Sequence, residues 1–279
     1  MRIMVTGATG MLGQDVLRVL RAHKHECLGV SSADFDLRDG AAVRAAVLAF
    51  QPEAIVHCAA YTAVDRAESE PEICCAVNGL GTLNIARAAR AVDAKLLYIS
   101  TDYVFDGSGD APLETDARPN PLNVYGLSKL QGEEAVRSVT PDHFILRVSW
   151  LFGHGGGNFV ETMRRLGREK SQITVVDDQI GSPTYTLDLA RLIAQMVSTR
   201  HYGTYHVSNE GFCSFADFAR MILRADGSRC RVVPIPSAQY PSAARRPLNS
   251  RLSKLSLEEN GFARLPIWED ALRRYIVGD

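Results

Sequence analysis

The sequence has few lysines, little net charge and no long apolar run. Its 31 basic residues face 32 acidic ones, for a net charge of −1, and the lysines are Lys24, Lys95, Lys129, Lys170 and Lys254. This balance gives no electrostatic basis for binding nucleic acid or an acidic membrane. No stretch reaches the roughly 18 apolar residues of a membrane span, and Asp15 interrupts the apolar run that a signal peptide would need. We therefore expect neither nucleic-acid nor membrane partners.

Metal-binding and disulfide patterns are also missing. The six cysteines, at 27, 58, 74, 75, 213 and 230, form no C-x-x-C pair, and the seven histidines show no H-E-x-x-H spacing. Such spacings are what mark zinc sites and redox motifs in a sequence. We expect buried, reduced thiols in a cytoplasmic protein, and no metal site.

A glycine-rich turn follows the first apolar run. Residues 3–5 predict a buried strand, Gly7, Gly10 and Gly13 follow as G-x-x-G-x-x-G, and apolar residues at 16, 17 and 20 predict a helix. A strand, a glycine turn and a helix form the site that binds a dinucleotide pyrophosphate, because the helix N–H groups face the anion. The spacing differs from the usual G-x-G-x-x-G, and a glycine-rich turn without a ligand is the alternative.

The second predicted strand, residues 26–31, bears on the choice of cofactor. An acid at its end would bond the 2′-OH of NAD, whereas this chain has Ser31 and Ser32. The absence of an acid favours NADPH, because it leaves room for a 2′-phosphate. NADH remains the alternative, because no arginine stands beside these serines to pair that phosphate. Asp36 and Leu37 are either part of the adenine pocket or a loop acid beside a packed leucine.

Predicted strands and helices alternate through the first half of the chain. We predict a helix over 39–50 capped by Asp39, strands over 54–57, 95–100 and 143–149, and a helical stretch over 72–92. This alternation predicts an α/β fold with a doubly wound parallel (Rossmann) sheet. Residues 1–150 would form the dinucleotide-binding core. Residues 151–279 would mainly form a smaller substrate-binding lobe, with helices near 158–168, 186–198, 214–225 and 267–276, strands over 172–176 and 231–234, and segments that return to the core.

Tyr125 and Lys129 are four residues apart on a predicted helix and would share one face. A tyrosine is a poor acid, with a reference pKa of about 10, and a nearby ammonium group would lower that pKa and suit Tyr125 to proton donation. Lys129 could also hold the ribose hydroxyls of a nicotinamide cofactor. The alternative is a solvated pair on a helix surface.

Three further segments carry candidate site residues. Small residues follow the third strand, and the fourth strand ends in Thr101 and Asp102, where open α/β sheets bind ligands. Arg245 and Arg246 lie on a proline-rich loop, where they would suit a diphosphate or would simply be exposed charges.

With the glycine turn, Thr101, Tyr125 and Lys129 in this order, the sequence resembles the extended short-chain dehydrogenase/reductases. Within them it is most similar to the dTDP-4-dehydrorhamnose reductase family. The resemblance spans nearly the whole chain and is carried by residues 59–68, 100–107, 125–133, 146–150, 157–159, 181–186, 205–209 and 245–247.

The resemblance implies a reaction and a set of roles. The chain would use NAD(P)H to reduce the C4 keto group of dTDP-4-dehydrorhamnose to dTDP-L-rhamnose, for polysaccharide synthesis. Tyr125 would protonate the carbonyl oxygen, Lys129 would hold the ribose and tune Tyr125, and Thr101 would bond the carbonyl. Thr101, Asp102 and Trp150 would contact the substrate, together with Arg246. The implied cofactor contacts are Gly10, Met11, Leu12, Asp36, Leu37, Ala60, Tyr61 and Thr62, beside Gly7, Gly13, Ser31, Tyr125 and Lys129.

Several alternatives remain within and beyond this family. Sugar-nucleotide dehydratases carry a glutamate where this chain has Tyr103, so dehydration is disfavoured, whereas epimerases use the same tyrosine and lysine. A non-catalytic subunit similar to the regulatory subunit of methionine adenosyltransferase is an alternative from another class. The intact Tyr125–Lys129 pair favours catalysis.

Some members of the family form homodimers around Mg²⁺ held by acidic residues near the C-terminus. Here Glu258, Glu259, Glu269 and Asp270 show no spacing that identifies such a site. A homodimer and a bound Mg²⁺ are therefore both left open.

Overall fold

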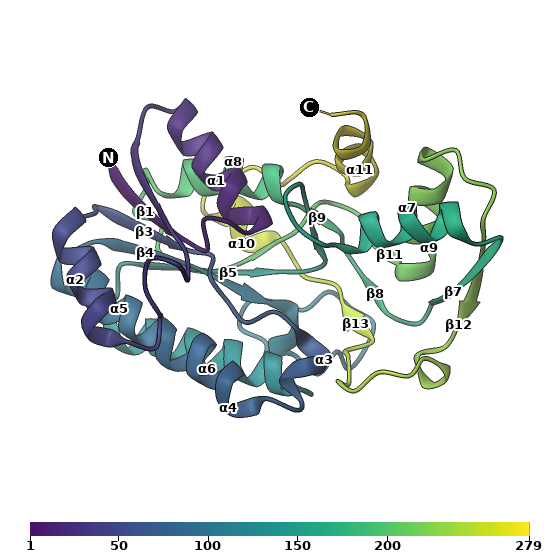
Figure 1. Cartoon of the computed structure of the whole chain (residues 1–279), viewed down its shortest axis with the longest axis horizontal. Helices are drawn as coiled ribbons and strands as arrows, with labels where there is room; N and C mark the ends of the chain where they lie inside the picture. The colour runs from purple at the N-terminus through teal and green to yellow at the C-terminus, as the bar shows by residue number, and fades with distance from the viewer. Residues whose placement is uncertain (279) are drawn as a thin grey trace.

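A computed structural model describes residues 1–278, and a six-stranded parallel sheet forms its centre (Figure 1). The strand order is β2–β1–β3–β4–β5–β10, and every neighbouring pair is parallel. The strands are β1 (Arg2–Thr6), β2 (Glu26–Val30), β3 (Ala54–His57), β4 (Lys95–Thr101), β5 (His143–Val148) and β10 (Gly203–Val207). The chain leaves β1 on one side to form β2 and returns on its other side to form β3. Open α/β sheets bind ligands at such a switch point, beyond the carboxyl ends of the strands.

Helices cover both faces of this sheet (Figure 1). One face packs against α1 (Met11–Ala22) and α8 (Thr186–Met196), and the other against α2 (Gly40–Phe50), α5 (Gly81–Ala91) and α6 (Val124–Val139). Successive side chains of β1 therefore enter different cores, with Ile3 and Val5 on the α1 side and Met4 on the other. Burial on both faces explains why the strands are continuous apolar runs.

A smaller group of elements lies beyond the carboxyl ends of the strands, on the right of Figure 1. Helices α7 (Phe159–Glu169) and α9 (Phe215–Ala225) pack there with β7 (Gln172–Val176) and β12 (Arg231–Ile235). The other elements are short or peripheral: α3 (Val64–Ala67), α4 (Pro71–Cys75), β6 (Leu151–Phe152), β8 (Ile180–Gly181), β9 (Thr184–Tyr185), β11 (Cys213–Ser214), β13 (Asn249–Ser250), α10 (Leu255–Glu259) and α11 (Trp268–Val277).

The predicted α/β class and doubly wound parallel sheet are confirmed. The structure differs in two places. The sequence did not predict β10, which completes the sheet from the second half of the chain, and the stretch 72–92 contains a π-helical turn, Ala76–Leu80, between α4 and α5. The division at residue 150 remains a prediction. Within residues 1–278, no helix combines the length and apolarity needed to cross a bilayer.

Candidate active site

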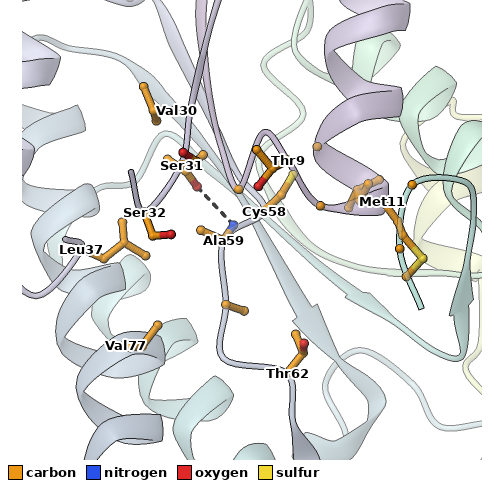
Figure 2. Close-up of a pocket in the computed structure, with 18 of the residues that line it drawn as sticks. Thr9, Met11, Val30, Ser31, Ser32, Leu37, Cys58, Ala59, Thr62 and Val77 are labelled. Atoms are coloured by element: carbon orange, nitrogen blue, oxygen red, sulfur yellow. Dashed lines mark hydrogen bonds between the residues drawn. The ribbon is translucent and has the colours of Figure 1, made fainter. Parts of the chain in front are cut away.

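A cavity of about 640 Å³ opens at the switch point, where β1 and β3 end (Figure 2). Its size falls within the range of small-molecule and cofactor sites. It contains ten of the residues that the sequence marked for the cofactor: Gly7, Gly10, Met11, Leu12, Gly13, Ser31, Asp36, Leu37, Ala60 and Thr62.

The glycine turn shapes one wall of this cavity. Gly7 has a φ of +67°, its carbonyl accepts from the Gly10 N–H at 3.0 Å, and a Cβ at Gly7 would lie 2.7 Å from the Ala59 nitrogen. The Gly10 position begins α1 with no side-chain cap, and the first turn of α1 has no acidic residue. The unpaired N–H groups and positive end of α1 therefore face the cavity, which suits the pyrophosphate of a dinucleotide.

The end of β2 corrects one sequence-based expectation. Ser31 donates from its N–H and its hydroxyl to Asp34, at 2.8 and 3.0 Å, and Arg38 lies in the same cavity. Arg38 donates to the Asp36 carboxylate from its backbone N–H and from two guanidinium nitrogens, with a closest contact of 2.6 Å, and these bonds lower the pKa of Asp36 to about 2. The sequence places no arginine beside Ser31, whereas in the structure Arg38 lines the same cavity as Ser31. The sequence alone does not show that the two residues share a cavity.

Tyr61 lies outside the residues that line the cavity. Its hydroxyl donates to Glu70 at 2.8 Å, and its backbone N–H and C=O bond the Asn78 side chain at 2.8 and 3.0 Å. Asn78 is buried in the π-helical turn and also donates to the Ser128 hydroxyl at 2.9 Å. Asn78 thus fixes the loop after β3 to α6. Sequence reasoning missed it because nothing local marks a buried asparagine as a link between distant segments.

The predicted catalytic side chains come from β4 and α6. Asn123 caps α6 by accepting from the Gly126 N–H at 2.7 Å, so Tyr125 lies in the first turn and Lys129 lies one turn later. Thr101 ends β4, where its hydroxyl donates to Asp102 at 3.1 Å and accepts from the Tyr103 N–H at 3.2 Å.

Burial dominates the acid–base properties of this group. Burial raises the pKa of Tyr125, and the charge of Asp102 raises it further by a smaller amount. A hydrogen bond with Thr101 opposes this rise. Burial also lowers the pKa of Lys129 to about 7, against the opposing charge of Glu133. The expected lowering of the Tyr125 pKa by Lys129 is therefore wrong for this structure. The Lys129 amine lies 4.1 Å from the centre of the Tyr98 ring, and burial outweighs its charge.

Asp102 has an unusual environment for a carboxylate. It is buried, and its pKa is raised by burial to about 6. Among the described residues, its Oδ2 atom makes no hydrogen bond by distance and angle, although the neighbouring Ser250 hydroxyl acts to lower its pKa. The Oδ2 atom is therefore a buried acceptor with little hydrogen bonding.

A second cavity, of about 860 Å³, lies between the sheet and the smaller group of elements. It is lined by Asp65, Arg245 and Arg246, and by apolar residues that include Phe215. Arg246 pairs with Asp65 at 2.8 Å, and this bond is the main cause that lowers the Asp65 pKa to about 2. Trp150 stacks on Phe215 with ring centres 3.7 Å apart. Arg246 therefore lies in the cavity, and Trp150 lies behind its wall.

Thr101, Tyr125 and Lys129 line neither cavity, but each cavity contains a neighbour of this group. On one side, the Lys129 charge acts on Cys58, which lines the first cavity. On the other side, Tyr103 packs edge-on against Tyr125 and bonds Arg246 in the second cavity. A cofactor in the first cavity and a substrate in the second would meet near Tyr125.

Asp270, one of the acidic residues near the C-terminus, is paired with an arginine. Arg274 bonds both Asp188, at 2.6 Å, and Asp270, at 2.8 Å, and so occupies the oxygens that a hard cation would need. Over residues 1–278 there is no group of three or more His, Cys, Asp or Glu side chains that could hold a metal ion.

Comparisons with known proteins agree with this geometry. The model of the family described as RmlD substrate binding domain matches residues 1–278. A dTDP-4-dehydrorhamnose reductase from Streptomyces griseus is 42% identical, over 97% of this chain and 91% of the relative. A dTDP-4-keto-6-deoxy-D-glucose reductase from Streptomyces niveus is 38% identical, over 97% of this chain and 95% of the relative.

A solved structure has almost the same fold. The dTDP-4-dehydrorhamnose reductase from Bacillus anthracis, in complex with NADP, superposes with a TM-score of 0.97 at 41% identity and covers 100% of this chain and 99% of its own. The chain therefore belongs to the RmlD substrate binding domain family, the family of the dTDP-4-dehydrorhamnose reductases.

Proposed function

We propose that the protein reduces the C4 keto group of dTDP-4-dehydrorhamnose to dTDP-L-rhamnose with NADPH. The observation that carries this proposal is that Thr101, Tyr125 and Lys129 have neighbours in both a dinucleotide-shaped cavity and a second cavity that contains Arg246. The family's named reductases and the NADP complex of a relative support the same reaction.

Each side chain would have its own role in the reduction. NADPH, when bound, supplies the hydride. Tyr125, whose raised pKa keeps the phenol protonated, donates its proton to the carbonyl oxygen. Thr101 turns its hydroxyl to the same oxygen, and Lys129, with a pKa of about 7, returns a proton to the tyrosinate. The Oδ2 atom of Asp102 accepts a hydrogen bond from a hydroxyl group of the sugar.

Arg246 and Trp150 would position the substrate. Arg246 already lies in the second cavity, and its guanidinium suits a diphosphate. It would have to exchange its pairing with Asp65 for the diphosphate. Trp150 would act by holding Phe215 in the cavity wall.

The cofactor contacts are proposed in the same way. The glycine turn and the start of α1 would hold the pyrophosphate, Ala60 and Thr62 would line the nicotinamide half, and Ser31, Asp36 and Leu37 the adenosine half. We propose NADPH rather than NADH because β2 ends without an acid and Arg38 lines the same cavity as Ser31. Tyr61 would contribute by holding the loop after β3 in place, because its backbone N–H and C=O bond the Asn78 side chain.

The test uses purified protein with NADPH and dTDP-4-dehydrorhamnose. We expect NADPH to be oxidised only when the sugar nucleotide is present. An absence of oxidation, together with tight binding to a partner protein, would instead support a non-catalytic regulatory subunit. The cysteines are all free, which supports a reducing compartment, and we take this compartment to be the cytoplasm. We also propose that the protein forms the homodimer known in its family.

A second substrate is favoured by one comparison. The relative from Streptomyces niveus is named a dTDP-4-keto-6-deoxy-D-glucose reductase. The two candidate sugars differ in ring stereochemistry, so kcat/KM should be measured with each. A higher kcat/KM for the D-glucose-derived substrate would replace the rhamnose assignment while keeping the reaction type.

A further inference from the structure

A glycine loop from the second half of the chain closes one side of the cofactor cavity. Residues 153–157 lie between β6 and α7, and Gly155 and Gly156 line the cavity. Gly155 has a φ of +81°, and a Cβ at Gly156 would lie 2.7 Å from the Met11 Cγ atom. The Gln14 amide bridges the two segments by donating to Thr9 and Gly155 carbonyls, at 2.7 and 3.4 Å. The loop is therefore packed closely against the start of α1.

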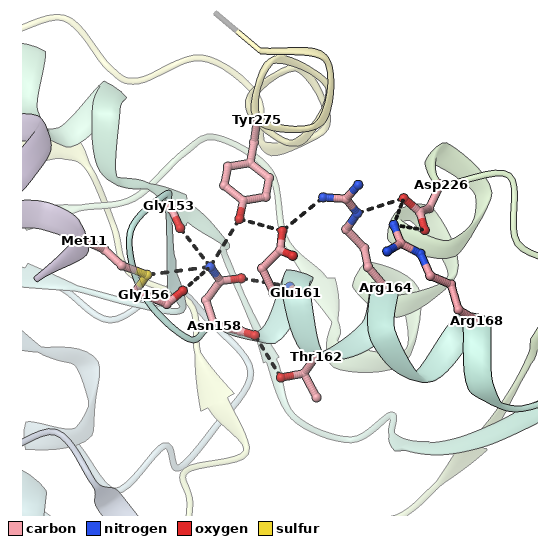
Figure 3. Close-up of polar contacts among 10 residues, drawn as sticks. All are labelled: Met11, Gly153, Gly156, Asn158, Glu161, Thr162, Arg164, Arg168, Asp226 and Tyr275. Atoms are coloured by element: carbon pink, nitrogen blue, oxygen red, sulfur yellow. Dashed lines mark hydrogen bonds and ion pairs between the residues drawn. The ribbon is translucent and has the colours of Figure 1, made fainter.

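Asn158 holds this loop in shape (Figure 3). Its Nδ2 atom donates to the Gly153 carbonyl at 2.8 Å and to the Gly156 carbonyl at 3.4 Å, and lies 3.6 Å from the Met11 sulfur. Its Oδ1 atom accepts from the Glu161 N–H at 3.1 Å and so caps α7. One side chain thus performs two separable tasks: the oxygen caps a helix and the nitrogen closes a loop.

The loop is also supported from behind (Figure 3). The His154 ring stacks on the Tyr275 ring of α11, with ring centres 4.4 Å apart. The Tyr275 hydroxyl donates to Glu161 at 2.8 Å, and Arg164 joins Glu161 to Asp226, the residue after α9. The elements behind the loop are therefore cross-linked by hydrogen bonds, and the loop has a fixed base.

We propose that Asn158 is a positioning residue for the cofactor, because its amide nitrogen holds the glycine loop 153–157 against the start of α1 over the cofactor cavity. This proposal rests on the proposed use of a dinucleotide. A loop that is held in its closing conformation loses less conformational entropy when a ligand binds. Releasing the loop should therefore weaken cofactor binding and leave the chemical step unchanged.

The test separates the two atoms of the Asn158 side chain. Asn158→Asp and Asn158→Ser both keep an oxygen that can cap α7, and both remove the amide donor that reaches the two glycine carbonyls. We expect the Kd for NADPH, from fluorescence titration, to rise about tenfold in both variants, which corresponds to about 1.4 kcal/mol. The KM for NADPH should rise in parallel, while kcat at saturating NADPH stays within about twofold.

Thr162→Val provides the matched control. Thr162 donates to the Asn158 carbonyl at 3.0 Å in the same helix turn but does not contact the loop. This variant should bind NADPH like the unmodified protein. Unchanged NADPH affinity in Asn158→Ser would overturn the proposal, and so would a loss confined to Asn158→Asp, which would indicate only charge repulsion. If the unmodified protein itself failed to bind NADPH, the proposed function would fail instead.

Discussion

Tyr125 is kept protonated by the same burial that makes it a weak acid. Removing only its hydroxyl should therefore abolish proton donation and preserve the packing of the ring against Tyr103. For Tyr125→Phe we expect kcat to fall by about 10²- to 10⁴-fold, the usual contribution of general acid catalysis. The Kd for NADPH should stay nearly constant. A variant that retained kcat would show that another group donates the proton.

Lys129 should impose a pH dependence near neutrality. Burial lowers its pKa to about 7, so the amine carries its proton below that pH and loses it above. Because the protonated form is the one that can return a proton to Tyr125, kcat should decrease as pH rises through about 7. In Lys129→Met this decrease should disappear from the pH profile of the residual activity. If it persisted, Asp102, with a pKa of about 6, would be the better candidate.

Arg38 should contribute to the choice between the two nicotinamide cofactors. It lies in the cavity with Ser31, and a charge-assisted hydrogen bond to a phosphate contributes about 1.5–3 kcal/mol. Arg38→Ala should therefore reduce the preference for NADPH over NADH, measured as a ratio of kcat/KM values, by about 10- to 100-fold. Arg44→Ala, on the exposed face of α2, should leave the ratio unchanged. An equal loss of activity with both cofactors in Arg38→Ala would place the arginine elsewhere in the mechanism.

Residues whose role depends on local spacing were predictable from the sequence. The glycines at 7, 10 and 13 and the Tyr125–Lys129 pair depend on a turn and a helix, and both form where expected. Asn78 was not predictable, because its contacts join segments that only the folded chain brings together, and the place of Arg38 in the cofactor cavity was not predictable either. The Tyr125 pKa was mispredicted for a related reason: spacing gives the neighbour of a side chain but not its burial.

At the scale of elements, α6 is the link between the catalytic groups and the sheet. Glu133 follows Lys129 by one helix turn and is fully buried. Its carboxylate accepts from the Ser100 hydroxyl at 2.6 Å and from two nitrogens of Arg147 at 2.8 and 2.9 Å. Glu133 thus joins α6 to β4, immediately before Thr101, and to β5.

Removing the buried charge of Glu133 should lower the free energy of unfolding. Glu133→Gln leaves the buried Arg147 guanidinium without its counter-charge, and we expect the free energy of unfolding to fall by about 3–5 kcal/mol in urea denaturation. Arg137 bonds the same carboxylate from a half-exposed position, so Arg137→Ala should lower the free energy of unfolding by only about 1 kcal/mol or less. Similar losses in the two variants would contradict a special role for the buried pair.

Elements that depend on nearby residues were predictable from the sequence, whereas elements that depend on a distant partner were not. Helix α2 begins where Asp39 predicts it, because the Asp39 carboxylate accepts from the N–H groups of Ala41 and Ala42. Strand β10 has only five residues and pairs with β5, which precedes it by more than fifty residues. Its place in the sheet is decided by that distant partner and by burial between both faces, which a local pattern does not contain.

At the scale of the whole molecule, Arg274 of α11 joins that helix to Asp188 of α8. Asp188 is buried and is held by Arg274, which also pairs with Asp270 on its own helix, α11. A divalent cation would have to displace these charge-assisted bonds and find further oxygen ligands. Treatment with EDTA should therefore leave both the reductase activity and the elution volume in size-exclusion chromatography unchanged. A loss of either one that added Mg²⁺ restores would show that the acidic residues exchange Arg274 for a metal ion.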